Sequence, residues 1–271
     1  MKSKLHTKTD LEHAQHELEV HSKMNHPNII QLLGGEETYE SIIIITPLAI
    51  GDLYSVASNK VLEESNCRNL CIQLLNGLLY LHETMGIIHG DIKPQNILLF
   101  LDDNNKYNAR ICDFGFSESI KLGDNLRYNG MKGSLGYFSP EQLHRQPISH
   151  AVDIFAFGVI VYQLLCGYEP FFPSNKAGYL TGDWEGGDSK ILLFDSPYWD
   201  GVSNDAVEFV KGCLHGDPRQ RMTARQALES RWISLAAAST GLANDENNRA
   251  ISNAEDRDIQ FATSQPFKIT V

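Results

Sequence analysis

Four polar residues near the middle of the chain have side chains suited to handling a hydroxyl group and a metal ion. Asp91, Lys93 and Asn96 share one short segment, and Asp113 follows further along the chain. A carboxylate can orient a hydroxyl and accept its proton. Amide and carboxylate oxygens are ligands that Mg²⁺ takes in proteins. Each acid taken singly is read most simply as a solvated surface carboxylate, so order and spacing must carry the interpretation.

The segment around these residues resembles the catalytic loop of eukaryotic protein kinases. Residues 89–96 read H-G-D-I-K-P-Q-N, against the family pattern H-R-D-x-x-x-x-N. The resemblance implies that Asp91 orients the acceptor hydroxyl and takes its proton, that Lys93 reaches the γ-phosphate of ATP, and that Asn96 holds a metal ion. A lysine two positions after the aspartate is the form found in Ser/Thr kinases.

A second motif, Asp113-Phe114-Gly115, follows an apolar run and a polar turn. This layout resembles the magnesium motif of the kinases, which lies just after a short hairpin. The resemblance implies that Asp113 binds Mg²⁺ between the β- and γ-phosphates. A lone D-F-G triplet arises often by chance, and its value comes from its distance downstream of the catalytic loop.

Three further segments match the family in the same order. Residues 133–141 resemble the end of the activation segment, with S-P-E in place of A-P-E. Residues 153–158 resemble the start of the central buried helix, and residues 217–223 resemble the late D-P-x-x-R motif.

These three matches imply specific contacts. Glu141 and Arg221 would form a buried ion pair, which is costly to break by removing one partner. Asp153 would hold the backbone of the catalytic loop. Ser134 would hydrogen-bond near Asp91, which again favours Ser/Thr acceptors.

The resemblance also assigns the front of a nucleotide cleft. It implies that Glu17 is the glutamate of the mobile helix, with a solvated helix face as the plain alternative. It also implies that Ile45 is the gatekeeper and that Thr46, Pro47 and Leu48 form a hinge that offers backbone groups to adenine. Asp52 would contact the ribose, and Leu98 would form the floor of the pocket.

Apolar periodicity predicts the elements that must position these groups. Helices are expected at 9–24, 66–84, 153–166, 206–214 and 223–228, and strands at 29–33, 41–46 and 97–100. The third helix is apolar all round, which predicts burial on every side. Four successive isoleucines in the second strand predict burial on both faces, and the glycine pair at 34–35 predicts a turn.

Elements and resemblance together predict an α+β fold of the protein-kinase-like two-lobe type, with a mostly helical C-lobe and an incomplete N-lobe whose first strands are missing. Residues 1–46 would form the partial N-lobe, with the mobile helix and two strands. Residues 47–234 would form the C-lobe with the catalytic loop and activation segment. Residues 235–271 are expected to be a disordered tail, because their polar composition has no period.

The chain departs from the family pattern at its start. Kinases place a glycine-rich loop and a V-A-I-K lysine before the mobile helix. Residues 1–10 contain no glycine and no strand-like run, and neither Lys2 nor Lys4 stands in a matching context. These features predict an incomplete gene product or a fragment.

Two single positions also depart from the pattern. Gly90 replaces the arginine that in many kinases pairs with a phosphate on the activation segment, which predicts activity that does not depend on phosphorylation there. His21 stands where the family usually has an apolar residue that stacks toward Phe114, which predicts a weaker active arrangement.

Composition restricts the class of protein. The 271 residues carry a formal net charge of −11, which argues against nucleic acid or an anionic membrane as the main partner. The five cysteines show no CxxC spacing, and no signal peptide or membrane-length apolar run is visible. We expect an intracellular, cytoplasmic protein with ATP and Mg²⁺ as cofactors and protein substrates as partners.

Two functions remain open from the sequence. The first is a Ser/Thr protein kinase, most similar in its H-P-N-I-I and D-I-K-P-Q-N forms to the calcium/calmodulin-dependent group. The second is a pseudokinase or truncated kinase that binds proteins without transferring phosphate.

Overall fold

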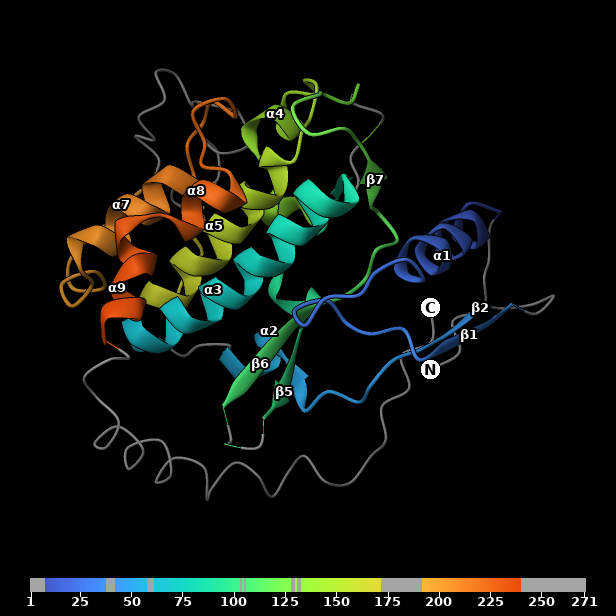
Figure 1. Ribbon diagram of the computed structural model, residues 1–271. Helices are drawn as coiled ribbons and strands as arrows, with labels where there is room; N and C mark the ends of the chain where they lie inside the picture. The colour runs from blue at the N-terminus through green and yellow to red at the C-terminus, as the bar shows by residue number, and fades with distance from the viewer. Residues whose placement is uncertain are drawn as a thin grey trace.

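The computed structural model of the chain describes residues 8–37, 42–57, 61–102, 104, 106–127, 130, 133–171 and 192–239. Figure 1 shows a large helical body beside a smaller part that contains the first helix and a two-stranded ribbon. This arrangement agrees with the predicted α+β kinase fold.

Two long helices form the centre of the helical body (Figure 1). Helix α3 (Glu64–Leu79) continues into a π-helical turn (Tyr80–Met85), which ends at Gly86 in the left-handed conformation that favours glycine. Helix α5 (Ala151–Cys166) is buried on nearly all sides, as its continuous apolar sequence predicts.

Shorter helices cover this centre. They are α7 (Asn204–Cys213), α8 (Ala224–Leu228) and α9 (Arg231–Ser239). Helix α7 approaches α5 closely at Gly158, where an added Cβ would lie 2.9 Å from the Cβ of Cys213. Helix α9 continues past Leu235, where the tail was expected to start, and residues 240–271 lie outside the described residues.

Three small sheets are present among the described residues. Strands β3 (Gly51–Asp52), β5 (Ile97–Leu101) and β6 (Tyr107–Ile111) form an antiparallel sheet, strand β4 (Ile87–Ile88) pairs with β7 (Glu118–Ser119), and β1 (Gly34–Glu37) pairs with β2 (Ile42–Ile45). The β5–β6 hairpin connects the catalytic loop to the D-F-G motif. The β4–β7 pair holds the segment after the D-F-G motif against the π-helical turn at the end of α3.

Helix α1 (Lys8–His21) packs against the β1–β2 ribbon. Gly35 lies under this helix, because an added Cβ there would approach the Leu18 side chain to 2.5 Å. Two further short helices, α2 (Leu53–Ala57) and α4 (Pro140–Leu143), follow the hinge region and the activation segment.

The strand predicted over 29–33 does not form, and this prediction was wrong. Ile29 makes only an isolated bridge to Ile111, and the Ile30 amide donates to the Ile111 carbonyl at 2.9 Å. Ribbon pairing starts later, at 34–37, where a turn was predicted. Ile29 and Ile30 pack against the β5–β6 hairpin instead, because burial there removes them from water, and each is only 2% exposed.

Strand β2 is also less buried than its sequence predicted. Ile42 is fully buried, the next two isoleucines are intermediate, and Ile45 is 50% exposed. Helix α1 is the main contact of the ribbon among the described elements, and burial falls along the strand from Ile42 to Ile45.

Candidate active site

A buried carboxylate holds the catalytic loop from below. Asp153, in the first turn of α5, accepts hydrogen bonds from the backbone amides of His89 (2.8 Å) and Gly90 (2.9 Å). The Nε2–H group of His82 donates to the same carboxylate at 2.9 Å. Burial by itself would raise the pKa of Asp153, but these hydrogen bonds and the His82 and His89 rings outweigh it and hold that pKa below its usual value. The contact expected from the sequence is therefore present.

Asp91 has one carboxylate oxygen that is bonded and one that is not. Its Oδ2 accepts from Lys93 Nζ at 2.6 Å and from Asn96 Nδ2 at 3.1 Å, and the same amide nitrogen donates to the Asp91 carbonyl at 2.9 Å. Its Oδ1 is buried and has no hydrogen-bond partner among the described residues. Because a buried acceptor without a partner is costly, this oxygen marks a place where a ligand would be bound.

The activation segment passes directly over this carboxylate. Lys93 Nζ also donates to Ser134 Oγ at 3.0 Å, so one ammonium group joins Asp91 to the segment. At Gly133, with φ of +103°, an added Cβ would lie 2.6 Å from the Gly90 carbonyl oxygen and 3.3 Å from Asp91 Oδ1. Only glycine allows the two backbones to approach this closely.

A pocket opens beside the same groups. Asp91, Ser134 and Tyr137 are among the residues that line it, and its interior has room for about one water molecule. Burial, followed by the charge of Glu169, raises the pKa of the Tyr137 phenol well above its usual value, so the phenol stays neutral.

Backbone contacts bring the D-F-G motif to the catalytic loop. Cys112, which precedes Asp113, donates its amide to the Asn96 carbonyl at 3.0 Å and accepts from His89 Nε2–H at 3.0 Å. Asp113 has φ of +67°, which is uncommon for a residue other than glycine. Phe114 is fully buried, with its ring centroid 5.3 Å from the centroids of both the His21 and His89 rings.

The oxygen groups here suit a hard cation. The described residues contain no cluster of three or more His, Cys, Asp or Glu side chains that could hold a metal by themselves. The expected set is smaller, namely the amide oxygen of Asn96 and the carboxylate of Asp113. Mg²⁺ typically takes one or two carboxylates and completes its shell with water and phosphate oxygens, so the donor types of this sparse set fit it.

Glu17 faces this region from α1 and does not lie on a solvated helix face. It is 7% exposed, and its Oε2 would lie 4.0 Å from a Cβ added at Gly115 of the D-F-G motif. Burial, together with the nearby charge of Asp113, raises the pKa of Glu17 to about 7.

The residues expected to contact the nucleotide differ in their position and exposure. Asp52 and Leu98 lie opposite each other in the β3–β5 pair, so the ribose contact and pocket floor are neighbours. Ile45 is half exposed, which is more than a side chain at the back of a pocket would show, and this part of the expectation is not met by the described residues. Thr46 is intermediate in burial and Leu48 is 67% exposed.

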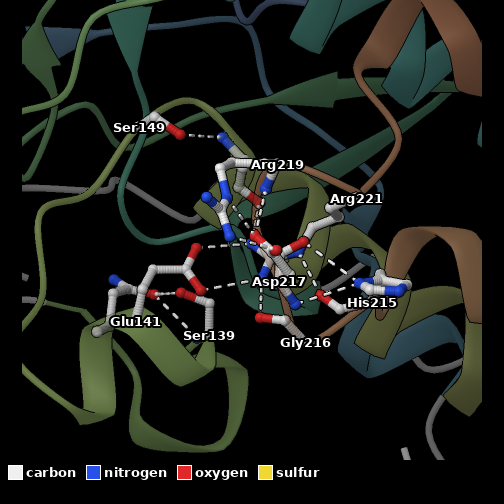
Figure 2. A network of polar contacts seen from close by, with 10 residues as sticks. Ser139, Glu141, Ser149, His215, Gly216, Asp217, Arg219 and Arg221 are labelled. Atoms are coloured by element: carbon white, nitrogen blue, oxygen red, sulfur yellow. Dashed lines mark hydrogen bonds and ion pairs between the residues drawn. The ribbon is translucent and has the colours of Figure 1, made fainter. Parts of the chain in front are cut away.

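The ion pair between Glu141 and Arg221 forms in the protein interior (Figure 2). Arg221 Nη1 and Nη2 donate to the two Glu141 oxygens at 2.7 and 2.9 Å. The guanidinium also donates to the Ala151 carbonyl at 2.8 Å and to the His215 carbonyl at 2.9 Å. These bonds connect the end of the activation segment, the start of α5 and the loop after α7.

One contact near the site gave no signal in the sequence. His16 Nε2–H donates to the Ser117 carbonyl at 2.8 Å, across 101 positions of the chain. Only its place beside Glu17 could have drawn attention to it, because a histidine on a polar helix is otherwise unremarkable.

Comparisons with known proteins match most of the chain. The family model of the protein kinase domain matches residues 1–233. The chain is 36% identical to calcium/calmodulin-dependent protein kinase type 1 of Macrobrachium nipponense, over 83% of this chain and 64% of that protein. It is 35% identical to the type 1B kinase of Rattus norvegicus, over 83% of this chain and 63% of the relative. The chain thus spans less than two thirds of the length of these relatives.

Proposed function

Because the chain belongs to the protein kinase family, we propose that it transfers the γ-phosphate of ATP to serine and threonine hydroxyls of protein substrates, with Mg²⁺ as cofactor. The observation that carries the proposal is the Asp91 carboxylate, whose Oδ2 is fixed by Lys93 and Asn96 while its buried Oδ1 has no hydrogen-bond partner among the described residues. Asp91, Lys93, Asn96 and Asp113 are all retained, and a domain that only binds other proteins has no need of all four, which favours the enzyme over the pseudokinase alternative.

The roles of the residues follow from their contacts. Asp91 Oδ1 accepts a hydrogen bond from the substrate hydroxyl, orients it, and takes its proton as the hydroxyl oxygen bonds to the γ-phosphorus and the bond from that phosphorus to the ADP oxygen breaks, so that ADP leaves. Lys93 and Asn96 fix the other oxygen, so the carboxylate cannot rotate away. Lys93 also places positive charge beside the reacting groups.

The metal-binding role falls to two residues in this proposal. Bound Mg²⁺ would neutralise the negative charge that develops during phosphoryl transfer. Asn96 would offer its amide oxygen, because its amide nitrogen is used in bonds to Asp91. Asp113 would offer its carboxylate, and Glu17, Asp52 and Leu98 would border the nucleotide.

Preference for aliphatic hydroxyls is supported by the activation segment. The bond from Lys93 to Ser134 brings the segment over Asp91 and narrows the approach to the carboxylate. A short serine or threonine side chain fits this approach better than a tyrosine does.

The cellular setting is also a proposal. The similarity to calcium/calmodulin-dependent type 1 kinases supports membership of that group. No helix in the described part of the chain is long and apolar enough to cross a membrane, and all five cysteines are free thiols. We infer an intracellular protein that works in the cytoplasm. We also propose that its two lobes divide near residue 46.

The test is a phosphorylation assay on the protein that carries this chain, with labelled ATP, Mg²⁺ and a generic protein substrate. Asp91→Asn should lower the rate by about 100-fold or more, because a positioned general base contributes at least that much. Asp200→Asn changes an exposed carboxylate and is the matched control. If Asp91→Asn keeps a rate within a few-fold of the wild type, the proposed function is wrong.

Nucleotide binding gives a second readout. ATP with Mg²⁺ at about 100 times its Kd should stabilise the fold by about 2.7 kcal/mol, which corresponds to roughly 5–11 °C in Tm. Asp113→Asn should remove most of the part of this shift that depends on Mg²⁺. An unchanged Mg²⁺ dependence would show that Asp113 is not a metal ligand.

A further inference from the structure

Helix α1 contacts the segment after Asp113 at both ends of a single turn. The turn spans Phe114 to Ser117 and is closed by two bonds to the Phe114 carbonyl, from the Ser117 amide at 3.0 Å and from Ser117 Oγ at 2.7 Å. The Glu17 carboxylate lies near one end, where its Oε2 would be 4.0 Å from a Cβ added at Gly115, and His16 Nε2–H donates to the Ser117 carbonyl at the other. Neighbouring residues of one helix therefore border both ends of the turn, and His16 supplies the hydrogen bond.

The surroundings of His16 support a fixed role. Ser117 is only 4% exposed, so its carbonyl has little access to water that would replace a lost donor. His16 Nε2 also lies 3.3 Å from Ser117 Oγ. Because the acceptor is a carbonyl oxygen, Nε2 must carry the hydrogen.

The turn directly follows a residue with strained backbone. Asp113 has φ of +67°, and such conformations persist only where surrounding contacts over-determine them. The same helix adds a third contact, since the His21 ring packs against Phe114 and is itself fixed by a 2.6 Å bond to the Ile30 carbonyl. Holding the turn limits the rotations by which Asp113 would relax.

We propose that His16 is a positioning residue, which acts through Ser117 to hold the 114–117 turn and thereby keeps the Asp113 carboxylate in its metal-binding orientation. The link to metal binding rests on the proposed function. The hold on the turn does not, and it is measurable without ATP or substrate.

The variants separate a hydrogen bond from general packing. His16→Leu removes the donor, whereas His16→Gln places an amide N–H at a similar reach and should restore the bond. Lys23→Leu, just beyond the C-terminal end of α1, is the matched control. It breaks an exposed ion pair with Glu19 of that helix, in which the Lys23 and Glu19 side chains are 60% and 68% exposed.

The first readout is amide hydrogen exchange of peptides that cover 114–117. His16→Leu should speed exchange there by roughly threefold to tenfold, the effect of losing one hydrogen bond of ordinary strength. His16→Gln and Lys23→Leu should leave it near the wild-type rate. Unchanged exchange in His16→Leu, or an equal increase in peptides from α5, would overturn the proposed hold.

The second readout is the Mg²⁺ concentration that gives half of the ATP-dependent thermal shift. His16→Leu should raise it by roughly threefold to tenfold, with rescue by His16→Gln. If exchange increases while the Mg²⁺ requirement stays constant, His16 does not position Asp113. If the wild type shows no Mg²⁺ response at all, the proposed function fails, and the exchange result still decides whether His16 holds the turn.

Discussion

Replacing Arg221 by methionine should destabilise the helical body by about 3–5 kcal/mol, the usual effect of breaking a buried ion pair from one side. The structure shows why the cost is high. The Arg221 side chain is 0% exposed and that of Glu141 is 2% exposed, so the remaining carboxylate would be buried without a counter-charge. The carbonyls of Ala151 and His215 would also lose their donor.

The assay is urea unfolding at neutral pH, with the midpoint and slope fitted for each variant. For a domain of this size the expected loss corresponds to roughly 6–20 °C in Tm. Arg225→Met is the matched control, because its partner Glu83 lies at the surface and the Arg225 side chain is 55% exposed. An exposed pair of this kind contributes about 1 kcal/mol or less.

The double variant, with Glu141→Gln added to Arg221→Met, tests the physical cause. If the buried unpaired charge dominates the cost, neutralising it should recover a large part of the lost stability. A loss in Arg221→Met no greater than that in Arg225→Met would refute the reasoning. A double variant that recovers nothing would assign the cost to the carbonyls and to packing.

Three further predictions concern the same lobe. Asp153→Asn should cost about 1–3 kcal/mol in urea unfolding, because one amide oxygen cannot serve both backbone donors at His89 and its neighbour; an unchanged midpoint would contradict this. Gly158→Ala should destabilise by about 1–3 kcal/mol despite alanine's better helix propensity, since the added methyl meets Cys213; a more stable variant would show that α7 can move. Burial, with the charge of His82 adding to it, lowers the pKa of His150 to about 4. As the pH falls from about 6.5 toward 4, the unfolded chain therefore binds a proton that the folded chain does not, and stability is lost over that range. His150→Phe should lose less stability than the wild type between pH 7 and pH 5, and equal losses would contradict the assignment.

Much of the site could be predicted because its residues come in ordered, closely spaced motifs. Asp91, Lys93 and Asn96 lie in one loop, and short loops leave few ways to arrange their side chains. The contacts of Asp153 with the loop backbone also follow the expected pattern. The long helices were predictable for a similar reason, since their apolar period is written locally.

Predictions failed where burial depended on partners distant in the chain. Nothing within 29–33 indicates that Ile29 would bridge to Ile111 rather than extend a ribbon. The isoleucine strand was expected to be buried on both faces, yet burial falls along it and Ile45 is half exposed. The cover depends on where α1 packs, which the residues of the strand do not indicate.

The sequence by itself determined which groups are available for chemistry and in what order they occur along the chain. Only the tertiary structure decided that Glu17 is buried beside Asp113 and that His16 reaches Ser117. The physical reason is that the desolvation of a carboxylate and the direction of a hydrogen bond depend on which elements pack together. That packing is set by apolar surface over the whole molecule rather than by the local pattern of residues.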